Sequence, residues 1–212
     1  ITLQLEFNQL SNTSARQSYK TVVKGSKRFL TIRPSDPDKG ISFSYSWKYR
    51  IGQIDPQVDE NILYLLPFKN SSAVLVKSLY SIEQRYFNSE KAVDWKAYMF
   101  KFDNEDEITA IRKGIVVKKV NQFLADTTKD YSYNSNANEV TIEHEDGSFS
   151  RYVGFKKDNI YVKEGDKIFP SEPIGVIGRY GKGSEPELRL IVYYFINQDN
   201  EYKTKYIDPV FA

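Results

Sequence analysis

Residues 137–155 read ANEVTIEHEDGSFSRYVGF, and this stretch decides the fold class. It contains two runs in which apolar and polar residues alternate, joined by Asp146-Gly147. Alternation with a period of two is typical of strands with one buried face, and Asp-Gly between two such runs is a strong hairpin signal. The stretch therefore predicts two antiparallel strands connected by a tight turn.

The same alternation recurs outward from this hairpin in both directions. Ile1, Leu3, Leu5 and Phe7 fall on one face of an expected first strand. Further strands are expected over residues 27–32, 41–47, 61–66, 73–77, 95–102, 115–120, 160–162, 174–177 and 187–196. No segment carries a sustained helical stripe, and the abundance of Tyr (16) and Phe (13) favours strands. We therefore predict an all-β, antiparallel fold.

Composition excludes several classes of function. The 212 residues contain 30 Lys plus Arg and 28 Asp plus Glu, and the net charge of +2 is too small to indicate a nucleic-acid partner. No run approaches the ~20 apolar residues that a membrane-spanning helix needs. Cysteine is absent, which excludes disulfides and thiolate metal sites.

Four short motifs surround the hairpin. Residues 110–114, a turn of small residues with Arg and Gly, precede a strand, and the hairpin itself reads Asn-x-x-x-Ile-x-His-x-Asp-Gly and ends in Tyr152. A Val-x-x-Gly-Asp turn (residues 162–166) and an Ile-Gly-x-x-Gly turn (residues 177–181) then lead to the long strand at 187–195. This order resembles the lysostaphin/LytM-type zinc metallopeptidases of bacterial cell walls.

The resemblance implies an architecture. It covers residues 64–212, which we expect to form a LytM-like β domain with the duplicated hybrid motif fold. The stretch Tyr64-Leu65-Leu66-Pro67-Phe68 stands where related proteins carry Tyr-x-Leu-Pro-Phe before the catalytic domain. Residues 1–63 would form a separate small β region.

The resemblance also implies where zinc would bind in an active member: an upstream His, an Asp, and the second His of a His-x-His pair, with two further catalytic His. At the matching positions this chain has Lys101 for the Asp, Gly154 for the His of Tyr-x-His, and Glu187 and Arg189 for His-x-His. The upstream position falls near residues 84–86, which contain no His. The single histidine, His144, stands where the family has no ligand, and we interpret it as structural.

These replacements predict that no zinc and no other cofactor binds. Protonated Lys and Arg offer only donors, so Lys101 and Arg189 cannot coordinate a metal ion, and Glu187 is expected to neutralise one or both of them. As a functional alternative, some of the residues Tyr86, Tyr98, Tyr152 and Tyr180 would line the former cleft as stacking surfaces for sugar or peptide.

The expected function is therefore that of a catalytically inactive LytM-like protein. The resemblance implies a binding or regulatory scaffold for cell-wall hydrolases, exported to the bacterial periplasm or cell envelope. Two alternatives stay open: a module that binds peptidoglycan through the aromatic cleft, and an active zinc endopeptidase whose ligands lie elsewhere. Neither a nucleic-acid partner nor a transmembrane segment is expected.

Overall fold

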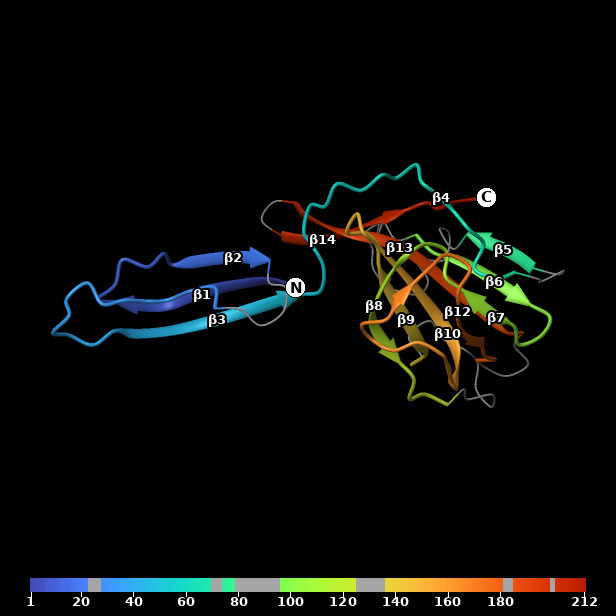
Figure 1. Ribbon diagram of the computed structural model, residues 1–212, viewed down its shortest axis with the longest axis horizontal. Coiled ribbons are helices and arrows are strands. Elements are labelled where there is room, and N and C mark those ends of the chain that lie inside the picture. Colours follow the sequence, from blue (N-terminus) through green and yellow to red (C-terminus); the bar gives the residue numbers. More distant parts are fainter. Residues whose placement is uncertain (23–27, 70–73, 79–95, 125–135, 181–184, 199–200) are drawn as a thin grey trace, which may run out of the picture. The chain divides into compact units, whose positions relative to one another are not determined.

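The computed structural model describes residues 1–22, 28–69, 74–78, 96–124, 136–180, 185–198 and 201–212 (Figure 1). Every regular element in these ranges is a β-strand, as the sequence predicted. The chain divides into two compact units, residues 1–54 and 55–212, so that residues 55–63 join the second unit. No helix of the described chain is long and apolar enough to span a membrane.

The first unit is a three-stranded antiparallel sheet in the order β2-β1-β3, formed by β1 (Thr2–Ser11), β2 (Ser18–Val22) and β3 (Ser42–Arg50). Its apolar face buries Leu5 and Phe7, in accordance with the alternation of the first strand. The strand expected at residues 27–32 is wrong, because residues 28–34 form no strand. The strand beside β1 on this side is β2, which was not expected and pairs through the register Leu3↔Thr21.

The second unit is built on a large antiparallel sheet in the order β11-β8-β9-β10-β13-β6-β5. β12 joins this sheet by pairing with β10 and β7, β14 pairs with β13, and β15 forms a separate parallel pair with β4. The strands are β4 (Leu63–Tyr64), β5 (Val74–Ser78), β6 (Tyr98–Phe102), β7 (Glu107–Thr109), β8 (Gly114–Val120), β9 (Asn138–Glu143), β10 (Phe149–Ile160), β11 (Lys167–Ile168), β12 (Pro173–Ile177), β13 (Glu187–Gln198), β14 (Glu201–Ile207) and β15 (Val210–Phe211).

The hairpin that decides the fold class is confirmed as β9–β10. Its register pairs Phe149 with Glu143 and Tyr152 with Val140, and the Gly147 amide donates to the His144 carbonyl oxygen at 3.0 Å. Gly147 has φ 85°, a value that glycine adopts readily and that this turn requires. β10 continues to Ile160. Ile160, the first residue of the short strand expected at residues 160–162, is therefore the last residue of β10.

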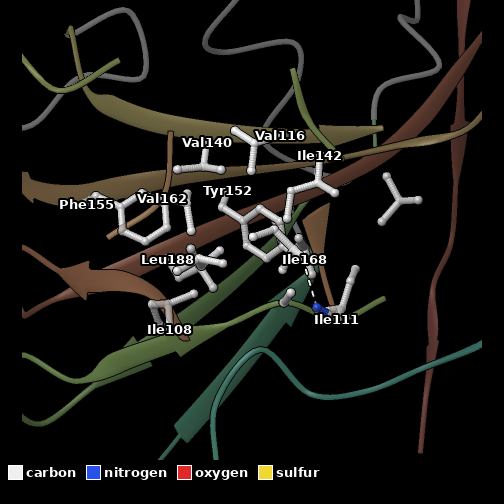
Figure 2. Packing of buried hydrophobic residues seen from close by; sticks show 14 of the residues in the cluster. Ile108, Ile111, Val116, Val140, Ile142, Tyr152, Phe155, Val162, Ile168 and Leu188 are labelled. Atoms are coloured by element: carbon white, nitrogen blue, oxygen red, sulfur yellow. Dashed lines mark hydrogen bonds between the residues drawn. The ribbon is translucent and has the colours of Figure 1, made fainter. Parts of the chain in front are cut away.

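One face of the large sheet carries the main hydrophobic core (Figure 2). Leu188, Tyr152 and Val140 come from three neighbouring strands and are fully buried there. The Tyr152 hydroxyl accepts a hydrogen bond from the Ile111 amide at 2.9 Å, drawn as a dashed line in Figure 2. This bond ties the turn before β8 to the centre of the sheet, so the core fixes the strands that carry the candidate site.

Candidate functional site

The four positions matched to the zinc site lie on three neighbouring strands: β10, β13 and β6. The register pairs Glu187 with Lys101 and Val153 with Arg189. Because residues directly opposite one another project from the same side of a sheet, Lys101, Glu187 and Arg189 share the face opposite the main core. We call this the charged face, and Gly154 lies at its edge. The structure thus brings the sequence-predicted positions together.

An ion pair dominates the charged face. Arg189 donates from Nε and Nη2 to Glu187 Oε1 at 2.9 and 2.5 Å. The side chains are only 6% and 14% exposed, so water screens this pair weakly. Lys101 Nζ lies 3.4 Å from Glu185 Oε2, at a more exposed position. Glu187 was expected to neutralise Lys101, Arg189 or both, and it neutralises Arg189. Lys101 makes an ion pair with Glu185 instead.

Gly154 approaches the neighbouring strand so closely that a side chain does not fit. Its φ is +119°, and a Cβ on this backbone would lie 2.4 Å from the Glu187 carbonyl oxygen and 3.1 Å from Ile177 Cδ1. Both the positive φ and the close backbone oxygen require glycine. A histidine at this position, as in an active relative, is incompatible with the backbone seen here.

The donors on the charged face do not fit a zinc ion. A hydrolytic zinc site needs three His, Asp or Glu ligands and an open position. Glu187 is the only such side chain among the four positions, and Arg189 already holds its Oε1. Within the ranges that the structure describes, no group of three or more His, Cys, Asp or Glu could hold a metal. The whole sequence contains one His and no Cys.

A second charged cluster, which the sequence analysis missed, lies on the same face. Glu139 pairs with Lys118 at 2.6 Å and accepts a bond from Arg151 Nε at 2.8 Å, and its side chain is 5% exposed. The register Val153↔Glu139 places this cluster one strand away from Arg189. Alternation in the hairpin could have indicated it, since Glu139 and Arg151 point away from the residues that form the core.

The aromatic residues expected to line the cleft are elsewhere. Tyr152 is completely buried in the main core, and burial raises the pKa of its hydroxyl to about 12. Tyr98 also faces that core, with its ring 5.6 Å from Phe211. Tyr180 is 3% exposed and bonds the Phe155 carbonyl oxygen. The expectations for Tyr152 and Tyr180 are corrected, because their rings are buried and offer no stacking surface. Tyr98 is partly buried, with its ring packed against the core. Tyr86 lies outside the described residues.

His144 is buried beside the β9–β10 turn. Its Nδ1 lies 2.9 Å from the Lys113 carbonyl oxygen, and the side chain is 2% exposed. Burial lowers the pKa of its imidazole to about 4, an effect that the bond to the Lys113 carbonyl only partly offsets. The ion pair between Arg112 and Asp146, at 2.8 Å, secures the same turn. The contacts of His144 are those of a structural residue.

The pKa of His144 predicts a loss of stability in mild acid. The folded state resists protonation until about pH 4, whereas the unfolded chain binds a proton below about pH 6.5, so stability falls between these values. We expect the free energy of unfolding to be about 2 kcal/mol lower at pH 5 than at pH 7.5 from this group alone. Urea denaturation at several pH values in this range measures the free energy of unfolding. The control is His144→Gln, in which this free energy should depend less on pH. An equally steep profile in that variant would contradict the assignment.

Comparison with known proteins identifies the family. The model of peptidase family M23 matches residues 93–209, and a search of curated proteins found no match. Solved structures with similar folds include a putative glycyl-glycine endopeptidase LytM from Ruminococcus gnavus, with 14% identity over 68% of this chain and 57% of that chain and a TM-score of 0.45. Lysostaphin shows 18% identity over 53% of this chain and 40% of its own, with a TM-score of 0.39.

A chain of the SpoIIQ–SpoIIIAH pore-forming complex shows 19% identity over 68% of this chain and 82% of its own, with a TM-score of 0.36. The chain thus spans 57% and 40% of the lengths of the LytM and lysostaphin structures. Its antiparallel all-β fold is the one that the hairpin motifs indicated. Because the family match extends over more than half of the 212 residues, the chain belongs to peptidase family M23.

Proposed function

We propose that this M23-family chain is catalytically inactive and acts by binding, as a scaffold or regulator of cell-wall hydrolases in the bacterial envelope. The observation that carries the proposal is the buried Arg189–Glu187 ion pair, which occupies positions matched to metal-binding and catalytic histidines. Arg stays protonated at every physiological pH, so Arg189 offers donors only and cannot be converted into a ligand.

Two further features support inactivity. The only metal-binding side chain among the four matched positions, Glu187, is engaged by Arg189. Gly154 lies so close to the Glu187 carbonyl oxygen that the β10 backbone leaves no room for a catalytic side chain. An active site lost by one substitution could be restored by one reversion, whereas here the charged side chains oppose zinc and the local backbone opposes a catalytic side chain.

The charged face supports a protein partner better than a glycan. Its rim presents Lys101, Lys118 and Arg151 with side chains 37%, 52% and 42% exposed. Such cations at the rim of an interface contribute mainly specificity and association rate toward an acidic protein surface. The alternative of a peptidoglycan-binding module depended on an aromatic cleft, but Tyr152 and Tyr180 are buried and Tyr98 is partly buried against the core.

Metal analysis tests inactivity directly. Protein purified without chelator is expected to contain far less than one zinc per chain and to leave purified peptidoglycan uncleaved, because its matched residues offer no ligand set. Elemental analysis after equilibration with a slight excess of zinc, together with lysostaphin as the positive control, provides the measurement. A stoichiometric, tightly held zinc would instead support an active endopeptidase with relocated ligands.

A binding experiment tests the scaffold role. Immobilised chain is expected to capture a cell-wall amidase or endopeptidase from an envelope extract, and Lys101→Glu should weaken this capture by reversing a charge on the rim. The matched control is Lys163→Glu, since Lys163 is also exposed but lies on the turn before β11. Recovery of peptidoglycan alone, or equal losses in the two variants, would count against the proposal.

A further inference from the structure

Strand β3 of the first unit is an edge strand with unusual features. It lies at one end of the order β2-β1-β3, and among the described residues it pairs only with β1 (Figure 1). Its nine residues, SFSYSWKYR, contain no proline, and the irregularity in the pairing falls on β1, between Phe7 and Gln9. Natural proteins usually protect such edges by shortening, bulges, proline or charged residues, and β3 has charge only near its end, at Lys48 and Arg50.

The side chains of β3 are also exposed. Phe43, Tyr45, Trp47 and Tyr49 share one face of the strand and are 48%, 53%, 56% and 62% exposed. The opposite face carries serines at 42, 44 and 46, followed by Lys48 and Arg50. β3 is therefore an apolar row backed by a polar row, with all of its charge at one end.

We propose that β3 pairs antiparallel with β3 of a second copy of this chain, about a two-fold axis at Ser46. This is the register in which all nine residues of both strands overlap. It places Tyr45 opposite Trp47 of the second copy and continues one aromatic row across the interface. Ser44 then lies opposite Lys48 of the second copy, so no like charges face each other. The interface goes beyond the proposed function and is independent of it.

Charge decides against the parallel arrangement. A parallel, in-register pair would place Lys48 directly opposite Lys48 of the second copy, about 5 Å away across the strands. The antiparallel pair separates these two lysines by four residues, about 14 Å, which is beyond the Debye length of about 8 Å at physiological salt. Antiparallel pairing therefore removes the main electrostatic cost of dimerisation.

Length decides against the other edge of the sheet. β2 has five residues against nine in β3, so β2 of a second copy would leave almost half of β3 uncovered. A β3–β2 contact would also be heterologous and would lead to open-ended assembly, whereas β3–β3 pairing closes as a symmetric dimer. The partner that best fits this edge is the same strand.

Sedimentation velocity of the 212-residue chain over micromolar concentrations tests the proposal. Dimer is expected at the upper concentrations. Ser44→Glu would face Lys48 of the second copy twice per dimer and should lower the dissociation constant by about 2- to 30-fold. Ser44→Lys should raise it by a similar factor. A matched control is Ser18→Lys on β2, which adds the same charge to the other edge and should leave the constant unchanged.

The opposite changes in the dissociation constant expected for Ser44→Glu and Ser44→Lys distinguish this register from general effects of charge. A chain that stays monomeric throughout, or Ser44 variants that shift the constant in the same direction, would overturn the proposal. A second measurement exploits the absence of cysteine. Ser46→Cys should cross-link efficiently between copies with a short bis-maleimide, whereas Ser18→Cys should not, and equal cross-linking at both positions would likewise overturn it. Unchanged circular dichroism spectra show that the variants remain folded.

Discussion

Glu187→Ala is expected to lower the free energy of unfolding of the second unit by about 3–5 kcal/mol, the range found when one partner of a buried ion pair is removed. The reason is that Arg189, whose side chain is 6% exposed, loses two hydrogen bonds to the Glu187 carboxylate while it stays charged. Water cannot replace these bonds fully at a site so little exposed. Urea denaturation followed by circular dichroism measures the effect.

Two controls separate this effect from a general loss of charge. Glu185→Ala removes the partner of Lys101 two residues earlier, where the carboxylate is 58% exposed, and should cost less than about 1 kcal/mol. The double variant Glu187→Leu, Arg189→Met replaces the whole pair by apolar groups and should lie near the wild type. If Glu185→Ala and Glu187→Ala were equally destabilising, the pair would not be the buried anchor that its geometry indicates.

Local patterns predicted the centre of the fold well. The β9–β10 hairpin followed from alternation and one Asp-Gly pair, which are encoded within about fifteen residues. β2 was missed because its sequence SYKTV is largely polar, and only its pairing with β1 makes it a strand. The strand expected at residues 27–32 did not form over 28–32, which have no such partner among the described residues. Strand formation at these positions depends on tertiary contacts more than on propensity.

Strand register explains which positions of the candidate site come together, whereas the face of the sheet that each residue occupies was predicted less well. The positions of Lys101, Glu187 and Arg189 converge as expected because strand register carries them together. Tyr152 was misplaced because its side of the sheet depends on which face of β10 meets the core, and a shift of one residue reverses this for the whole strand. The Arg151–Glu139 pair was overlooked although alternation in the hairpin places both residues on the face away from the core.

Gly154→Ala is expected to destabilise the second unit by about 2–5 kcal/mol, as the sum of two independent penalties. The first is backbone strain, because a side chain at φ +119° is strongly disfavoured. The second is a contact of 2.4 Å between the new Cβ and the Glu187 carbonyl oxygen, which belongs to the backbone of β13 and cannot rotate away. Urea denaturation again provides the measurement.

The chain contains a matched control for each penalty. Gly165 has φ +93° with nothing within 4 Å, so Gly165→Ala should show strain alone, about 1–2 kcal/mol. Gly175 has no positive φ, but a Cβ would lie 2.7 Å from the Asn159 carbonyl oxygen, so Gly175→Ala should show crowding alone, about 1–3 kcal/mol. Gly154→Ala should lower the free energy of unfolding by more than either control. A smaller loss than in either control would mean that β10 can move away from β13.

This comparison also bears on activity. If β10 cannot move, Gly154→His cannot restore a catalytic imidazole, even in a chain where Glu187 and Arg189 are also replaced by histidine, because the new side chain has no space beside β13. If Gly154→Ala is tolerated, the backbone is not what excludes a catalytic side chain at this position, and inactivity rests on the residues that replace the zinc ligands. The stability of one alanine variant therefore tells whether the site is closed by its backbone as well as by its side chains.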